Sequence, residues 1–260
     1  MNQLPESSLR IQTLGGFKVW LDAAEIEPGR WQREKALHLF QFFITTRRHG
    51  PLHKEEIINR LWPDLDSDEG DRDFKVALHA INKVLEPERK PRTTAKFIQR
   101  FDLTYALELS DIWLDADVFE QAVAAGNQAI PHNLESALAH HQQAVALYHG
   151  DYLPERRYED WCSLERERLQ VLALGSMTTL AELLVERSPL ESIRLTQHVL
   201  AIDPVWENAY RTQMRAYLAQ GNRPLALKTY RQCVAALEEE LAIDPLPETK
   251  ALYEEIVGIH

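Results

Sequence analysis

Residues 71–85 read DRDFKVALHAINKVL, and residues 96–109 read KFIQRFDLTYALEL. In the first stretch apolar residues recur at intervals of three and four, which predicts a helix with one buried face. The second stretch alternates apolar and polar residues, which is typical of a β-hairpin. The predicted buried face of the helix consists of Phe74, Ala77, Leu78, Ile81 and Leu85.

The residues before this helix complete the pattern. Alternation in 9–13 and 17–21 predicts a small antiparallel sheet, and helical spacing follows over 30–48, up to the stop signal His49-Gly50-Pro51. A short helix over 54–62 ends at Pro63. The order of sheet, three helices and hairpin predicts a winged helix-turn-helix with an extra N-terminal sheet.

From about Asp111 strand signals give way to successive amphipathic helices. Aligning these helices gives a period of 34 residues, which pairs Ser192 with Ala226 and Leu200 with Val234. Paired helices at this period are typical of tetratricopeptide repeats. The expected fold class is therefore an α+β winged helix-turn-helix DNA-binding domain over residues 1–110, followed by an all-α, tetratricopeptide-like helical repeat domain over residues 111–260.

The charge is unevenly distributed. Of the net charge of −11, residues 1–112 carry 17 Lys+Arg against 18 Asp+Glu, hence −1, and the remainder carries 12 against 22, hence −10. A nearly neutral first part binds DNA only if its cations share a face. No apolar run approaches the roughly 20 residues of a membrane helix, so we expect a cytoplasmic protein without membrane contact.

Several segments carry, in order, a resemblance to a known family. They are LRIQTLGGF (9–17), RWQREKALHLFQFF (30–43), LHKEEIINRLWPD (52–64), RDFKVALHAINKVLEP (72–87), IWLDADVFEQAV (112–123), ALYHGDYLPERRYEDWCSLERERL (146–169) and LAIDPLPETKALYEEI (241–256). Together they resemble the Streptomyces antibiotic regulatory protein family, in which an OmpR-type winged helix precedes a bacterial transcriptional activator domain. The resemblance implies sequence-specific promoter binding and recruitment of RNA polymerase.

In a helix-turn-helix the second helix of the motif lies in the major groove. Lys and Arg donate to guanine or phosphate, and Asn pairs with adenine. A solvated helix face is the alternative interpretation. The side chains expected to face DNA are Arg72, Lys75, His79, Asn82 and Lys83.

The hairpin and the first helix junction supply further candidates. Arg100 and Thr104 lie on the hairpin, and a wing of this kind resembles those that insert an arginine into the minor groove. Arg47, Arg48 and Lys54 flank the junction, where Lys54 and its helix N-terminus suit a phosphate. Ordinary solubilising charge is the alternative.

The segment PDLDSDEGD is predicted to be an acidic loop. Phosphate repels carboxylates, so the loop is expected to face away from DNA, and the resemblance implies that it meets RNA polymerase. A solvated loop is the alternative. The residues concerned are Asp64, Asp66, Asp68 and Glu69.

The leading hypothesis is a DNA-binding transcriptional activator. A non-enzymatic protein–protein adaptor with a degenerate winged helix is the alternative, since residues 79–83 read HAINK where the family carries several arginines. We expect no enzyme, cofactor or metal site, because the chain has no nucleotide-binding, zinc-protease or hydrolase motif. Partners are expected to be double-stranded DNA, RNA polymerase and a second copy of the chain, bound on DNA through the helical domain.

Overall fold

The computed structural model describes residues 7–258. The chain divides into two compact units, each formed by two segments. Unit 1 combines Met1–Val118 with His149–Leu169, and unit 2 combines Phe119–Tyr148 with Gln170–His260. The compact units therefore divide the chain differently from a single boundary near residue 110.

Unit 1 opens with a four-stranded sheet. Strands β1 (Leu9–Gln12), β2 (Lys18–Leu21) and β3 (Ala24–Glu25) form the predicted antiparallel meander. Strand β7 (Ile112–Leu114) adds to β1 in parallel, giving the order β3-β2-β1-β7. The sequence did not indicate β7, because three residues are too few to show alternation.

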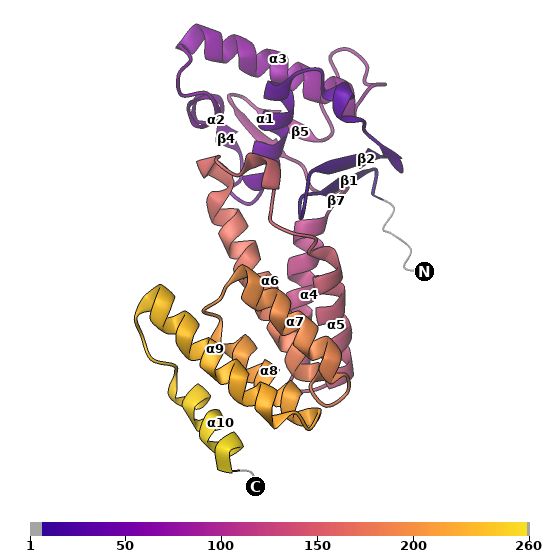
Figure 1. The fold of residues 1–260 in the computed structure, drawn as a ribbon. Helices are drawn as coiled ribbons and strands as arrows, with labels where there is room; N and C mark the ends of the chain where they lie inside the picture. The colour runs from indigo at the N-terminus through magenta and orange to yellow at the C-terminus, as the bar shows by residue number, and fades with distance from the viewer. Residues whose placement is uncertain (1–6, 259–260) are drawn as a thin grey trace. The chain divides into compact units, whose positions relative to one another are not determined.

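The helices of unit 1 follow the expected order (Figure 1). The 3-10 turn η1 (Pro28–Trp31) precedes α1 (Glu34–Thr45), and strand β4 (Leu52–His53) precedes α2 (Lys54–Leu61) and α3 (Ser67–Leu85). The hairpin strands β5 (Ile98–Phe101) and β6 (Thr104–Leu107) join β4 in a sheet of order β4-β6-β5.

Aromatic side chains hold α3 and the hairpin to the core of unit 1. Phe40, Phe74 and Ile81 are fully buried. Phe74 of α3 packs edge-on against Tyr105 of β6, with ring centroids 4.9 Å apart. Burying such a side chain contributes about 1.5–3 kcal/mol, so this contact stabilises the placement of α3 beside the hairpin.

Helix α3 begins earlier than the sequence suggested. Asp66 is its N-cap, and its carboxylate accepts from the backbone N–H groups of Asp68 and Glu69 at 3.0 and 2.8 Å. Acidic residues in a first turn also suit the helix dipole. The predicted acidic loop is therefore wrong beyond Asp66, since Asp68 and Glu69 belong to the helix.

Residues 149–169 pack on the sheet and α1 of unit 1. Leu14 bridges to Tyr152, and the N–H of Leu153 donates to the carbonyl of Thr13 at 2.9 Å. Tyr152 is fully buried, with its hydroxyl 2.9 Å from that of Thr45. Burial raises the pKa of this phenol, so it stays protonated. The 3-10 turn η2 (Pro154–Arg156) follows.

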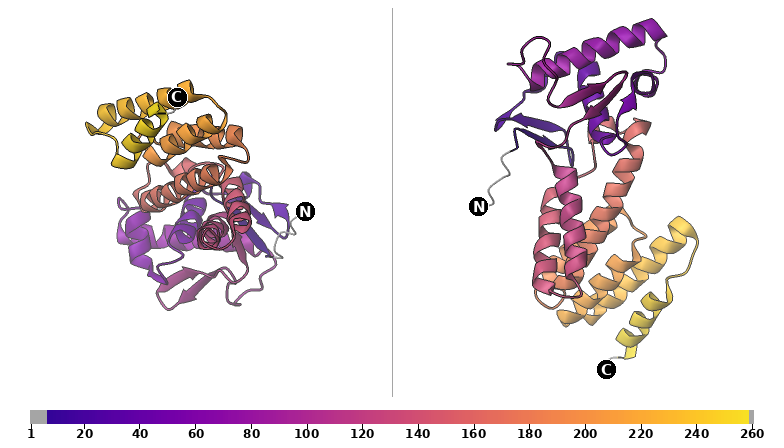
Figure 2. Two further views of the ribbon diagram at one scale, coloured as in Figure 1. Left: turned by 90° about the horizontal axis from the view of Figure 1, so that it is seen from below. Right: turned by 180° about the vertical axis from the view of Figure 1, so that it is seen from behind.

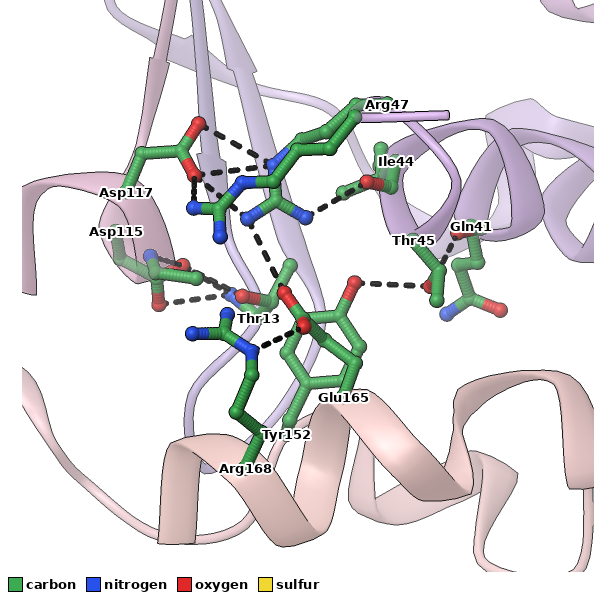
Figure 3. A network of polar contacts seen from close by, with 12 residues as sticks. Thr13, Gln41, Ile44, Thr45, Arg47, Asp115, Asp117, Tyr152, Glu165 and Arg168 are labelled. Carbon is green, nitrogen blue, oxygen red and sulfur yellow. Dashed lines mark hydrogen bonds and ion pairs between the residues drawn. The ribbon is translucent and has the colours of Figure 1, made fainter. Parts of the chain in front are cut away.

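Asp115 ties β1 to the end of β7 (Figure 3). Its buried carboxylate accepts from the N–H and hydroxyl of Thr13 and from the N–H groups of Leu14 and Ala116, at 2.7–2.9 Å. Burial raises its pKa, and these hydrogen bonds oppose the rise. Because four donors satisfy it, Asp115 is a structural residue.

Unit 2 consists of helices and confirms the predicted repeat architecture (Figure 2). Helices α7 and α9 begin 34 residues apart, and Ser192 and Ala226, which the period pairs, are both fully buried. Within residues 7–258, no helix has the length and apolarity that a membrane span needs. The helices are α4 (Asp115–Ala129), α5 (Leu134–Leu147), α6 (Asp160–Leu184), α7 (Pro189–Ile202), α8 (Glu207–Ala219), α9 (Arg223–Leu241) and α10 (Pro247–Gly258); α4 and α6 each begin in unit 1.

A buried histidine lies among the first helices of unit 2. His141 of α5 is fully buried, and its Nδ1 lies 2.9 Å from the hydroxyl of Ser176 in α6. The ring fits against Gly126, where a Cβ would lie 2.8 Å from it. Burial lowers the pKa of His141, as does the charge of His140.

Candidate nucleic-acid interface

A basic groove of about 660 Å³ lies in unit 1 between α3, the connection over residues 86–95 and the hairpin. None of its lining residues, all within the described part of the chain, is an aspartate or glutamate. Its basic side chains and histidine come from α2, α3, the connection over residues 86–95 and β5. They are Lys54, Lys75, His79, Arg89, Arg92 and Arg100.

The structure brings several predicted residues together in this groove. Lys54 of α2, Lys75 and His79 of α3, and Arg100 of β5 all line it. The side chain of Arg72 is 68% exposed on α3 but does not line the groove. Two other predicted residues also lie outside the groove: Lys83 is exposed, and the hydroxyl of half-buried Thr104 donates to the carbonyl of Phe101 at 2.8 Å.

One carboxylate restrains two of the groove lysines. Asp71 accepts from Lys54 and forms an ion pair with Lys75 at 2.5 Å. These hydrogen bonds, first that of Lys54 and then that of Lys75, hold the pKa of Asp71 below its ordinary value. Asp71 thus positions both ammonium groups at the groove while offsetting part of their charge.

Arg100 is held near the turn of the hairpin. Its Nε donates to the carbonyl of Asp102 at 2.6 Å, and Asp102 takes the left-handed backbone conformation, with φ of 57°. The guanidinium lies 6.0 Å from the ring centroid of Tyr105, the residue that packs on Phe74. The wing arginine and α3 are therefore linked through one aromatic contact.

Asn82 does not lie on an exposed face. It is 9% exposed, and its Oδ1 is enclosed and has no hydrogen-bond partner among the described residues. Asn82 also lines the groove. The expectation that Asn82 lies on the exposed face of α3 is wrong, because it is buried. Its contact with adenine stays a prediction.

Arg47 is a buried structural residue (Figure 3). Its side chain is 0% exposed, and its guanidinium donates to Asp117, to Glu165 and to the carbonyl of Ile44. Burial opposes the charged form of Arg47, but the hydrogen bonds to Asp117 and the nearby Tyr152, Asp117 and Glu165 together outweigh burial, so the pKa of Arg47 is raised. The expectation of a phosphate contact is not compatible with this placement. Arg48 is 46% exposed and bonds Asp117 at 2.8 Å.

Sequence reasoning missed the contribution of the connection between α3 and β5. Arg89, Arg92, Thr93 and Thr94 line the groove. The available signal was the basic run from Arg89 to Lys96, which reads RKPRTTAK and holds four cations. Two of these cations, Arg89 and Arg92, line the groove.

The acidic residues lie apart from the groove lining. Asp64, Asp66, Asp68 and Glu69 are all exposed around the start of α3, and none lines the groove. Asp66 is committed to capping α3. Of the other three, Glu69 lies 4.0 Å from Arg72. Within the described residues, no group of three or more His, Cys, Asp or Glu side chains is arranged to hold a metal ion.

Comparison with known families and structures places these observations in context. The sequence profile of the family described as "Bacterial transcriptional activator domain" matches residues 114–257, more than half of the chain. A solved structure of EmbR from Mycobacterium tuberculosis, in complex with a low-affinity phosphopeptide, superposes with a TM-score of 0.83 at 20% identity. The match covers 97% of this chain and 65% of the EmbR chain. No curated protein matched.

Proposed function

Because this chain belongs to the bacterial transcriptional activator domain family, as a regulator of the Streptomyces antibiotic regulatory protein type, we propose that it regulates transcription by binding duplex DNA through unit 1. The observation that carries the proposal is the basic groove beside α3, whose lining holds five Lys and Arg side chains and no carboxylate.

In this proposal α3 enters the major groove of DNA and the hairpin follows the adjacent backbone. Lys75 and Arg72 are exposed along α3 and are the candidates for base or phosphate contact. Arg100, held near the hairpin turn, is the candidate for the minor groove. Lys54, Arg89 and Arg92 contribute phosphate contacts.

Transcription activation would use surfaces outside the groove. Asp64, Asp68 and Glu69 are exposed carboxylates that phosphate repels, and we propose that they contact RNA polymerase. The helical repeats of unit 2 are proposed to associate with a second copy on DNA carrying repeated half-sites. Linked binding of two copies raises avidity without new DNA contacts.

Selection of bound sequences from random duplexes tests DNA recognition. The full chain is expected to enrich a motif, whose binding falls steeply with salt. Arg89→Ala then lowers the slope of log affinity against log salt by about 0.9, as for one lost phosphate contact. Arg231→Ala, an exposed arginine of α9, is the control. Failure to enrich any motif at low salt would favour the alternative function of a protein–protein adaptor. In that case the carboxylate of Asp71 would neutralise Lys54 and Lys75.

A further inference from the structure

The four-stranded sheet of unit 1 has a core face and an outer face. Leu9 and Ile11 of β1 point into the core and are fully buried. Arg10, between them, points to the outer face, because successive side chains of a strand alternate. Arg10 is paired in register with Trp20 of β2 and with Trp113 of β7, and all three are half-buried. These three side chains therefore lie side by side across the outer face.

The three side chains form a Trp–Arg–Trp stack. The guanidinium carbon of Arg10 lies over both indole rings, 4.8 Å from the ring centroid of Trp20 and 4.8 Å from that of Trp113. The face of an indole attracts a cation through its quadrupole. Because the two rings belong to strands on either side of β1, they fix the position of the charge.

The charge in this stack has no partner. Among residues 7–258, the guanidinium of Arg10 makes no hydrogen bond or ion pair, and its Nε is enclosed. Two other arginines of unit 1 differ, since Arg47 bonds Asp117 and Arg156 bonds Glu34. A charge withdrawn from water is ordinarily paired, because its desolvation costs free energy. The unpaired charge of Arg10 thus indicates a place for an anion from outside the chain.

The hydrogen-bonding groups of the stack are all donors. A guanidinium and an indole each have N–H groups and no acceptor. Within the described part of the chain, neither Trp20 nor Trp113 donates its indole N–H to another residue. Of the three nitrogens of Arg10, only Nε is enclosed without a partner, which leaves the two Nη groups as an accessible fork. A carboxylate fits this fork with two parallel hydrogen bonds.

The surroundings of the stack favour a protein partner over nucleic acid. Glu25, which is exposed, is the cross-strand neighbour of Trp20, and Asp22 is exposed in the turn between β2 and β3. These carboxylates would repel the repeated charges of a phosphate backbone, whereas a single carboxylate needs only one cation. Tryptophan and arginine are also the side chains that contribute most at the centres of protein–protein interfaces.

We propose that the outer face of this sheet is a docking surface for an acidic segment of a partner protein. The Nη groups of Arg10 bind one Asp or Glu carboxylate of that segment, and apolar side chains beside the carboxylate pack on Trp20 and Trp113. None of the three residues lines the basic groove, so the site goes beyond the proposed DNA function.

Displayed random peptides identify binders of the stack. The library is selected on the full chain after depletion on Arg10→Met, which keeps the length of the side chain and removes its charge. The two proteins share every other surface, so the surviving peptides depend on Arg10. They are expected to carry Asp or Glu beside an apolar residue. Circular dichroism checks the fold of the variant, and Arg10→Gln serves for depletion if Arg10→Met does not fold.

Substitutions on both sides of the contact test its geometry. Replacing the acid of a selected peptide by its amide is expected to weaken binding to the unmodified chain about tenfold, as for a lost charge-assisted hydrogen bond. Arg10→Lys keeps the charge without the fork and is expected to weaken binding about threefold. Trp20→Leu and Trp113→Leu are each expected to weaken it about tenfold. Arg30→Met, at an exposed arginine of η1, is the matched control and should bind normally.

Three results of the selection overturn the proposal: no peptide survives depletion, the survivors carry no acid, or the two tryptophan variants bind them as tightly as the unmodified chain. DNA binding is measured in parallel. A larger loss of DNA affinity for Arg10→Met than for Arg30→Met would assign the stack to phosphate and also overturn the proposal. Failure of the chain to enrich any DNA motif would count against the proposed function alone, because the stack lies outside the basic groove.

Discussion

The guanidinium of Arg47 donates hydrogen bonds of 2.6, 3.0 and 3.2 Å to the carboxylate of Asp117, which lies 70 residues further along the chain. Glu165 adds a third charge at 3.3 Å. Arg47 follows α1, Asp117 lies in the first turn of α4 and Glu165 lies in α6, so one buried arginine ties together three separate parts of unit 1.

Replacing Arg47 is expected to destabilise unit 1 without altering the proposed DNA-binding surface. Arg47→Ala leaves the carboxylates of Asp117 and Glu165 without their buried partner, which costs about 3 kcal/mol. Arg48→Ala is the matched control: its side chain is 46% exposed, so a loss below about 1 kcal/mol is expected. Urea unfolding measures both. DNA affinity of the folded Arg47 variant should equal that of the unmodified chain, and a drop would place Arg47 in the interface.

Removing exposed cations near α3 and the hairpin is expected to weaken DNA binding while leaving the fold intact. Arg72→Ala, Lys75→Ala and Arg100→Ala each remove an accessible donor, worth about 1–3 kcal/mol if it contacts a base. Anisotropy titration gives the affinity and circular dichroism checks the fold. Unchanged affinity for all three would mean that DNA meets another face.

Neutralising Asp71 is expected to strengthen DNA binding. Asp71→Asn releases Lys54 and Lys75 from their carboxylate, and removes a negative charge that would repel phosphate. A gain of about fivefold in affinity is expected for one charge near the surface. Asp244→Asn is the control, because Asp244 pairs with Lys250 in unit 2, outside the groove. Equal effects of the two substitutions at one salt concentration would indicate general electrostatics instead.

Charge reversal at the start of α3 is expected to separate DNA binding from activation. Asp64→Lys combined with Asp68→Lys changes exposed carboxylates while leaving the cap at Asp66 intact. Affinity for the selected DNA should persist, whereas transcription in a reconstituted assay with RNA polymerase should fall. A parallel loss of both activities would argue against a polymerase contact at this position.

His141 is expected to make the stability of unit 2 depend on pH. Its pKa is lowered by burial, so the unfolded chain takes up a proton at a higher pH than the folded chain does. The contribution of neutral His141 to the free energy of unfolding is therefore fully present above pH 6.5, the ordinary pKa of histidine, and is lost as the pH decreases below that value. Urea midpoints between pH 8 and pH 5 should show this slope in the unmodified chain. His141→Gln should flatten it, whereas the exposed His198→Gln should not.

Local sequence patterns predicted the helices and strands, but they did not predict contacts between residues far apart in the chain. Helix α3 and the hairpin rest on spacings of a few residues, and the period of 34 is a repetition of such helical segments, so the sequence displays all three directly. The pairing of β7 with β1 and the packing of Tyr152 on Thr45 join residues about a hundred positions apart. No local spacing encodes such contacts.

The candidate site shows the same division. The sequence predicted which cations lie on α3, but it did not predict which of the candidate side chains are buried. Arg47 and Asn82 have polar side chains that predict exposure. The burial of Arg47 depends on carboxylates that other segments supply, Asp117 and Glu165. The pairing of Lys54 with Asp71 likewise required the fold.

Because unit 1 consists of two separate segments of the chain, recombination between related genes can separate residues that contact each other. A single crossover between two related genes near residue 110 would replace Thr13 and Thr45 while leaving Asp115 and Tyr152 from the other parent. The hydrogen bonds that close unit 1 would then join residues of different ancestry. Residues 149–169 are therefore expected to coevolve with the N-terminal sheet and α1 rather than with the helical repeats that flank them in the gene.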